Sequence, residues 1–362
     1  MDRRTFLSRS AFGGGAVATA GLAAPAIAQG KQTLSMVTTW PRGLVGVWNA
    51  VSYFAKAVDQ ITDGYLTIDA KGAGEQVGAM AAFDAVTSGQ ADLYHGADYY
   101  FTERHPAFAY FTTVPFGMTA PEMMAWYYGG DGMALHHKLG ARFGLRSFLA
   151  GQTGAQGGGW FRTAVATATD FQGLKMRMPG LGGLVVAELG AEPQQLGAGE
   201  IYQALSTGAL DAAEWIGPWS DETLGLQEIC NSYYPAGFHE PGAALSVAAN
   251  LDMFERLSPV NQRALKLAAA ATHQQNYADF TLNNGPAMAR LIAGGTQVLQ
   301  FPHEVWDAFG AASVTVLERF MQDELFTEIH RSAQASMRAS SGWLAMSDGV
   351  YSAQRNRVLA AL

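Results

Sequence analysis

The sequence alternates, in two separate stretches, between short apolar runs and helical patterns. TLSMVTTW (33–40) has the composition of a buried strand, and apolar residues recur at helical spacing over about 44–61. A second alternation begins near residue 152, where the strand pattern LKMRMP (174–179) precedes the helical run LGGLVVAELG. Alternation of this kind predicts α/β domains, and 362 residues are enough for two of them.

Two further apolar runs connect the alternating stretches. LRSFLAG (145–151) leads out of the first, and GAALSVAAN (242–250) suits a strand that returns to the interior of the first sheet. Two such crossings predict a two-lobed clamshell, which binds a ligand between its lobes. The longest helical pattern (258–285) is expected to end at Gly285-Pro286 and to lean on both lobes.

The predicted domain organisation has two discontinuous lobes and a tail, and helical patterns at about 303–320, 322–338 and 340–362 finish the chain. The expected boundaries are 1–28 for an export signal, 29–151 with about 244–300 for lobe I, 152–243 with about 301–320 for lobe II, and 321–362 for a C-terminal helical extension.

The N-terminus has the features of a twin-arginine export signal. Arg3-Arg4 precedes the weakly apolar run AFGGGAVATAGLAAP and a small-x-small cleavage site at 26–28. That run is too short and too broken by glycine for a membrane anchor, and no later run approaches the length of a membrane span. The formal net charge of −8 argues against nucleic acid as a partner. We therefore expect an exported protein that is soluble after cleavage.

Charged residues occur inside two apolar runs that are typical of buried strands. Arg177 lies in LKMRMP and Glu214 lies in LDAAEWIG (210–217). Because an unpaired buried charge is costly, Arg177 needs a ligand carboxylate or a structural salt bridge, and Glu214 needs a pairing partner or a bound cation. Gln156 in the glycine-rich loop GQTGAQGGGWFR and Glu240 in FHEPG could add oxygen ligands for a hard cation. The simpler alternative is a flexible loop and two glutamates that are solvated or cap helices.

No motif carries an enzymatic signature. GLGGLV (180–185) lacks the third glycine of a dinucleotide fingerprint. His136-His137 has no zinc-site spacing, and no GxSxG elbow occurs. Cys230, the only cysteine, is expected to be a buried structural thiol.

Several longer segments resemble one transport family. DFQGLKMR and GEIYQALSTGALDAAEW resemble the signature of substrate-binding proteins of tripartite ATP-independent periplasmic (TRAP) transporters. MDRRTF, QGGGWFR, PQQLGAGEIYQAL, AAEWIGPWSDE and GTQVL are similar to the subfamily that binds 2-oxo monocarboxylic acids such as pyruvate. The resemblance covers nearly the whole chain. It implies a periplasmic receptor, not an enzyme, that delivers a small 2-oxo or 2-hydroxy monocarboxylate to a membrane permease.

The resemblance also implies which residues bind the substrate. Arg177 would clamp the substrate carboxylate, and Gln156 would contact both the substrate and a cation. Glu214 would lie against the same substrate, and Tyr100, in ADYYF, would form a wall of the pocket.

A metal cation, Ca²⁺ or Na⁺, is implied as the cofactor, with Gln156, the Glu214 side chain, the Trp215 carbonyl and Glu240 as its ligands. Glu214, Glu240 and the ligand carboxylate outweigh Arg177 by two negative charges. Ca²⁺ would neutralise this excess and Na⁺ would halve it, so the count slightly favours Ca²⁺.

The chain departs from the subfamily at the pocket rim. His239 stands where a bulky aromatic is expected, and Gln152 and Phe101 also alter the expected rim. The sequence therefore does not determine which side chain the bound acid carries. In the subfamily the C-terminal tail exchanges between subunits, which predicts a homodimer. The alternatives are a metal-free receptor of the same family for another organic anion, or an exported oxidoreductase.

Overall fold

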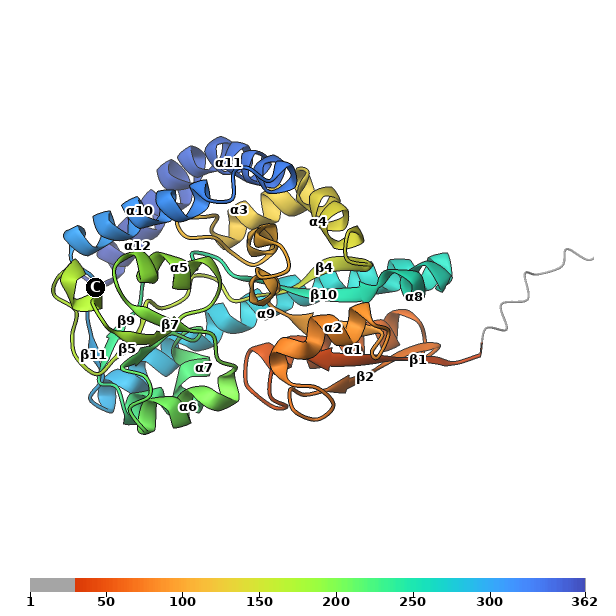
Figure 1. Ribbon diagram of the computed structural model, residues 1–362, viewed down its shortest axis with the longest axis horizontal. Helices are drawn as coiled ribbons and strands as arrows, with labels where there is room; N and C mark the ends of the chain where they lie inside the picture. Colours follow the sequence, from red (N-terminus) through yellow and green to blue (C-terminus); the bar gives the residue numbers. More distant parts are fainter. Residues whose placement is uncertain (1–29, 362) are drawn as a thin grey trace, which may run out of the picture. The chain divides into compact units, whose positions relative to one another are not determined.

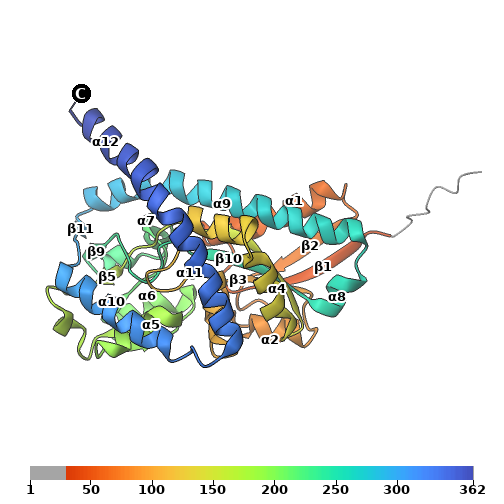
Figure 2. The ribbon, with the colours of Figure 1, turned by 90° about the horizontal axis from the view of Figure 1, so that it is seen from above.

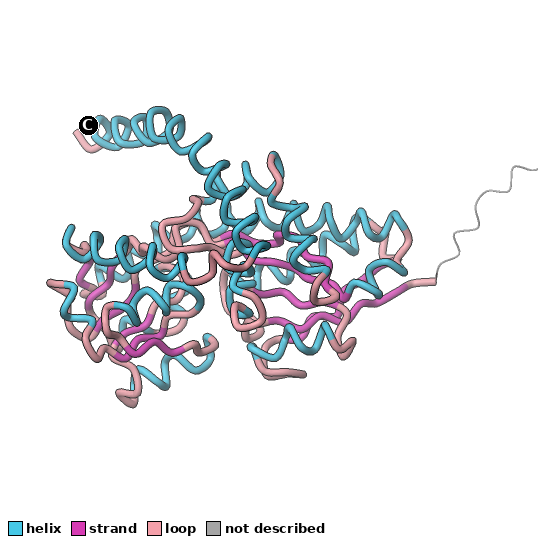
Figure 3. The backbone as a smooth tube through the Cα atoms, turned by 45° about the horizontal axis from the view of Figure 1, so that its top comes forward, coloured by secondary structure: helices cyan, strands magenta, loops and turns pink. Residues whose placement is uncertain are grey.

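The structure is a computed structural model that describes residues 30–361. Two sheets are formed, which Figure 3 shows as two separate groups of strands. The predicted export signal at 1–28 lies outside the described residues. Within residues 30–361, none of the helices combines the length and the apolar character that crossing a bilayer requires.

The first sheet has parallel strands on one side and an antiparallel strand near the other. β1 pairs in parallel with β2 and β3, and β10 is antiparallel to both β3 and β4. β10 is buried from Ala244 to Ala249, which confirms the predicted return of the chain to this sheet. The order across the sheet is β2 (Leu66–Lys71), β1 (Gln32–Thr38), β3 (Leu93–Gly96), β10 (Ala244–Asn250) and β4 (Leu145–Gln152).

The second sheet consists of short strands. β5 is antiparallel to β8 and β9, whereas β6 is parallel to β7 and β8. The order across the sheet is β11 (Gln297–Val298), β9 (Ser232–Tyr234), β5 (Gly159–Phe161), β8 (Ala212–Ala213), β6 (Lys175–Arg177) and β7 (Glu192–Gln194).

Helices surround both sheets (Figure 1). α1, α2, α4, α8 and α9 pack against strands of the first sheet, and α5 and α6 pack against strands of the second. α1 is an amphipathic helix: its buried residues recur at helical spacing along the one face that packs against the protein interior. The helices are α1 (Val47–Ile61), α2 (Ala82–Thr87), α3 (Ala120–Met124), α4 (Gly132–Ala141), α5 (Gly180–Glu188), α6 (Ala198–Ser206), α7 (Pro218–Thr223), α8 (Leu251–Arg256), α9 (Pro259–Ala293), α10 (His303–Glu318), α11 (Glu324–Leu344) and α12 (Val350–Leu359).

The chain passes between the two sheets twice as an extended segment, through 153–158 and through 235–243. The two passages are hydrogen-bonded to each other. Gln156 donates its N–H to the Glu240 carbonyl (2.9 Å) and accepts at its carbonyl from the Gly237 N–H (3.0 Å). α9 joins the sheets a third time, since it packs against β4 on one side and α7 on the other (Figure 2). The predicted lobe boundaries remain a prediction.

Two predicted element boundaries in the middle of the chain are wrong. LDAAEWIG holds only the two-residue strand β8, because the Glu214 carbonyl accepts from Arg177 Nη1 (3.2 Å) instead of continuing the ladder. The long helix does not stop at Pro286 but continues to Ala293. Proline leaves the carbonyl of Leu282 without a helical donor, and Leu282 is 74 % exposed, so water can satisfy that carbonyl.

The break expected between 338 and 340 is also wrong. α11 passes through a π-helical turn (Ala345–Gly349) directly into α12. Gly342 lowers helix stability by about 1 kcal/mol but does not end the helix. α12 contains no buried residue and extends away from its neighbours in Figures 2 and 3.

Candidate functional site

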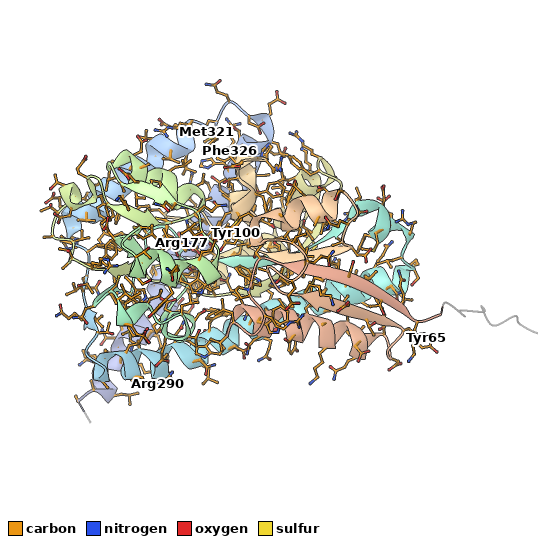
Figure 4. All side chains as sticks on the ribbon, turned by 60° about the horizontal axis from the view of Figure 1, so that its bottom comes forward. Tyr65, Tyr100, Arg177, Arg290, Met321 and Phe326 are labelled. Carbon is orange, nitrogen blue, oxygen red and sulfur yellow. The ribbon has the colours of Figure 1, made fainter. Side chains whose placement is uncertain are left out.

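Strand ends and the two passages bring the predicted site residues together. Gln156 lies in the first passage and Glu240 in the second, while Arg177 ends β6 and Glu214 follows β8. Tyr100 lies in a 3₁₀ turn after β3 of the first sheet. Figure 4 shows Arg177 and Tyr100 next to each other. The site therefore lies between the sheets at the carboxyl ends of strands, where open α/β folds bind ligands.

Arg177 is fully buried, and most of its donor hydrogens are already used. Nη1 donates to the Glu214 carboxylate and to the Glu214 carbonyl, Nη2 donates to the Tyr100 hydroxyl (3.1 Å), and Nε donates to the Leu196 carbonyl (3.2 Å). The guanidinium carbon lies 5.0 Å from the centre of the Trp215 ring. The structural salt bridge thus exists, and one Nη2 hydrogen stays available to a ligand.

Glu214 and Glu240 are two buried carboxylates that share one nearby arginine. Glu214 Oε1 accepts from Arg177, but Oε2 of both glutamates has no hydrogen-bond partner in the described part of the chain. Burial raises the pKa of Glu240 well above its usual value, and the charge of Glu214 raises it further. Two such carboxylates favour a cation, because it would compensate the charge that Arg177 leaves unpaired.

Gln156 adds an unpaired amide oxygen. Its Nε2 donates to Thr153 Oγ1 (3.0 Å), which leaves the buried Oε1 without a donor among residues 30–361. The glycine after Gln156 is required by packing. Gly157 faces the ring and hydroxyl of Tyr233, where any Cβ would collide.

Asp221 fixes the backbone that carries Trp215. Its carboxylate accepts from the N–H groups of Ile216 (3.0 Å) and Gly217 (2.9 Å) and from the indole of Trp160 (2.9 Å). Burial raises the pKa of Asp221 to about 7, although these donors lower it. No backbone N–H of the described residues donates to the Trp215 carbonyl. Asp221 was not among the predicted site residues, although an acidic side chain in the first turn of a helix is placed to accept from backbone N–H groups.

A cavity of about 10 Å³, which is room for about one water molecule, lies beside Gln156, Tyr100 and Trp215. Arg177, Glu214 and Glu240 do not line it. Trp40 helps to close it: its Nε1 donates to His95 Nδ1 (2.8 Å), and its ring meets Trp215 edge-on at 6.2 Å. Trp40 and Tyr99 were not among the predicted site residues, but both line the cavity. The lining includes Trp40, Tyr99, Tyr100, Gln156, Trp215 and Leu245.

The three expected departures at the rim have different outcomes. His239 lies with the carboxylates, since Glu214, His239 and Glu240 each offer a potential ligand atom within 4.8 Å of the others. Phe101 packs against Phe83 in the core (5.0 Å between ring centres), and buried Gln152 accepts from the Gly154 N–H (3.0 Å). Neither Gln152 nor Phe101 lines the 10 Å³ cavity described above. Their expected effect on the rim stays a prediction.

Comparison with known proteins places the chain in one family. Residues 38–324 match the family described as bacterial extracellular solute-binding protein, family 7. A monocarboxylate 2-oxoacid-binding periplasmic protein of Nostoc sp. is 39 % identical over 309 residues, which cover 85 % of each protein.

Two solved structures are similar over nearly their whole length. A TRAP transporter solute-binding protein from Bordetella bronchiseptica, a mixed-occupancy dimer with copurified calcium and picolinate, has a TM-score of 0.90 at 31 % identity, covering 92 % of this chain and 99 % of its own. A TRAP solute-binding protein from Pseudoalteromonas atlantica with bound sodium and pyruvate has a TM-score of 0.86 at 35 % identity, covering 89 % and 98 %. The predicted clamshell fold is confirmed, and the chain belongs to family 7 of the bacterial extracellular solute-binding proteins, the receptors of TRAP transporters.

Proposed function

We propose that this protein binds a small 2-oxo or 2-hydroxy monocarboxylate together with a metal cation and delivers it to a TRAP permease. One observation carries the proposal. Gln156 Oε1, Glu214 Oε2 and Glu240 Oε2 are buried near Arg177 and lack hydrogen-bond partners among the described residues. Buried polar atoms are nearly always satisfied, so unpaired oxygens at one site support a bound cation.

The donor set fits a hard cation. Two carboxylates, an amide oxygen and the Trp215 carbonyl are all oxygen ligands, which Ca²⁺ prefers. These groups would hold the ion, and the bound ion would chelate the ligand through its carboxylate and its 2-oxo or 2-hydroxy oxygen. The relatives with calcium and picolinate or with sodium and pyruvate support this ligand class, since both anions chelate through a carboxylate and an adjacent atom.

Arg177 would bind the ligand carboxylate with its free Nη2 hydrogen, and Tyr100 would share that nitrogen. Trp40 and Trp215 would enclose the apolar part of the ligand. The small cavity favours a short tail, because a longer tail would require the side chains around it to move apart.

A metal-free receptor for another anion is the second possibility. It requires the Glu240 side chain to point away from Glu214. The two carboxylates instead offer oxygens within 4.8 Å of each other, which favours the metal-dependent function.

The C-terminal helices support the proposed homodimer. Trp343, Met346 and Tyr351 are 68 %, 70 % and 66 % exposed, and such large apolar side chains usually find a partner. We propose that a second copy covers them after twin-arginine export to the periplasm. Size-exclusion chromatography with light scattering should give twice the monomer mass, and a monomer at micromolar concentration would exclude this dimer.

A thermal-shift series on the mature protein tests the ligand and the metal together. The protein is stripped with EDTA, and pyruvate or lactate is added alone, with Na⁺ or with Ca²⁺. A ligand at about a thousandfold excess over its Kd should raise the unfolding free energy by about 4 kcal/mol. We expect this gain only when a cation is present.

Two variants give the test its controls. Glu214→Gln should lose the cation-dependent gain. Glu222→Gln, which changes the exposed Arg290–Glu222 pair, should keep it. A gain that persists in EDTA would contradict the metal site, and no response to either acid would contradict the proposed ligand class.

A further inference from the structure

His239 is buried without any interaction that explains its imidazole. The side chain is 2 % exposed, and neither Nδ1 nor Nε2 has a hydrogen-bond partner in the part of the chain that the structure describes. A histidine that only filled space would leave two buried polar atoms without hydrogen-bond partners, which destabilises the folded protein. A ligand for one of these nitrogens would remove part of that destabilisation.

The distances around His239 fit a shared ion better than hydrogen bonds. Nε2 lies 3.5 Å from Glu214 Oε2 and 3.8 Å from Glu240 Oε1. Both are long for N–H···O hydrogen bonds. Two ligands held at about 2.0–2.2 Å by one ion, at angles of about 90–110°, lie roughly 3–3.6 Å apart. Small adjustments would therefore bring the three side chains onto one cation.

The backbone around His239 fixes which edge of the ring faces the carboxylates. A Cβ on Gly237 would lie 2.7 Å from His239 Cε1 and 2.8 Å from Nδ1, so this edge packs directly on the chain at Gly237. The Phe238 ring lies 5.5 Å away between ring centres. Nε2, on the opposite side, is the nitrogen nearest to Glu214 and Glu240.

We propose that His239 Nε2 is an additional ligand of the cation and that the site therefore prefers a borderline divalent transition metal, such as Co²⁺ or Zn²⁺, over Ca²⁺. This inference rests on the proposed cation site. Imidazole suits Zn²⁺, Ni²⁺ and Fe²⁺, whereas Ca²⁺ prefers oxygen ligands alone. A neutral imidazole leaves the charge count unchanged, so a divalent ion is still the one that neutralises the site.

Metal binding is measured first without organic ligand, by titration calorimetry of EDTA-stripped protein with Co²⁺ and with Ca²⁺. We expect the wild-type protein to bind Co²⁺ at least about tenfold more tightly than Ca²⁺. His239→Gln replaces the nitrogen by an amide oxygen, and it should lose about tenfold or more in Co²⁺ affinity while Ca²⁺ affinity changes by less than about threefold.

Three controls separate ligation from unfolding and from surface binding. Retained Ca²⁺ binding by His239→Gln shows that the variant is folded, and His239→Asn repeats the test with a shorter side chain. His303→Asn removes an exposed histidine and should leave both affinities unchanged. X-ray absorption of the Co²⁺-bound wild-type protein should show imidazole scattering, which requires no variant.

The outcomes distinguish this inference from the proposed function. Equal Co²⁺ affinities in wild type and His239→Gln, or absorption spectra without imidazole scattering, would overturn the role of His239. If Ca²⁺-dependent pyruvate binding persists in that case, the proposed function stands. If Co²⁺ binding depends on His239 but pyruvate never binds, the metal inference stands and the proposed ligand is wrong.

Discussion

Two buried polar clusters in this molecule differ in how completely their atoms are paired. Around Asp98, Oδ1 accepts from Tyr94 (2.9 Å), and Oδ2 accepts from Ser246 (2.8 Å) and pairs with His136 Nε2 (2.8 Å). His136 Nδ1 in turn contacts the Tyr127 hydroxyl (3.1 Å). Around Glu214, by contrast, buried oxygens and both nitrogens of His239 remain unpaired among the described residues. Single unpaired buried atoms also occur elsewhere, for example on His273. The Glu214 cluster differs because unpaired atoms of three residues, Glu214, His239 and Glu240, lie within reach of one ion.

The largest effect is expected at the complete cluster. Asp98→Ala would leave the buried Tyr94, His136 and Ser246 without their acceptor and should lower the unfolding free energy by about 3–5 kcal/mol. Denaturant unfolding of the metal-free protein measures this loss. The exposed Asp69→Ala is the control and should change little. A small effect of Asp98→Ala would mean that the complete cluster is not structural.

A substitution in the incomplete cluster should affect ligand binding rather than the stability of the metal-free protein. Glu240→Gln resembles the protonated acid that burial favours, so the metal-free protein should keep its stability within about 1 kcal/mol. The cation-dependent gain of about 4 kcal/mol should disappear. Paired thermal melts with and without Ca²⁺ and pyruvate give both numbers. If metal-free Glu240→Gln lost as much stability as Asp98→Ala, the contrast between the clusters would be wrong.

The next largest effect is expected at His95, which contacts Trp40 beside the cavity. Its Nδ1 accepts from Trp40 and its Nε2 contacts the Ala150 carbonyl (3.0 Å). Burial lowers the pKa of His95 to about 4, against about 6.5 in the unfolded chain. Between these values the unfolded state binds more protons, so stability should fall as the pH falls from about 6.5 to about 4, by about 3 kcal/mol.

His95→Gln should remove this part of the pH dependence, because an amide can accept and donate in the same places without titrating. Denaturation midpoints of the two proteins from pH 7 to pH 4 compare the slopes. Parallel slopes would show that His95 does not control the acid response.

The smallest effect concerns the one contact that joins Arg177 to the first sheet. Tyr100→Phe removes the hydroxyl that accepts from Nη2 and frees that donor for the ligand. We expect a change in pyruvate Kd of about tenfold or less, equivalent to about 1 kcal/mol. Calorimetry at saturating Ca²⁺ measures it. Complete loss of binding would make Tyr100 an essential ligand contact rather than a pocket wall.

The sequence predicted the incomplete cluster better than the complete one. Arg177 and Glu214 stood out because a charge inside an apolar run demands a partner. Gln156 and Glu240 were candidate oxygen ligands from their loops, and the family resemblance added Tyr100 and the Trp215 carbonyl. The structure brings these residues together, and their roles in binding remain predictions.

Asp98 and His136 carried no such signal. Their contact joins residues 38 positions apart, and the contact of Asp98 with Ser246 joins residues 148 apart. Neither spacing produces a periodic pattern. The helix through Pro286 was mispredicted for a related reason, since the stability of this long helix comes from packing against β4, α1 and α7 rather than from local propensity.

The placement of the site between the two sheets also bears on how fast a solute can bind and leave. Arg177 and Glu214 are fully buried, and the adjacent cavity holds about one water molecule. If the proposed ligand binds here, a space of that size would not let a carboxylate pass, and the ligand would enter and leave only when Trp40 and Tyr100 separate from Trp215 and Arg177. The residence time of the solute would then be limited by how often the clamshell opens, and a permease could control release by acting on the lobes without touching the solute.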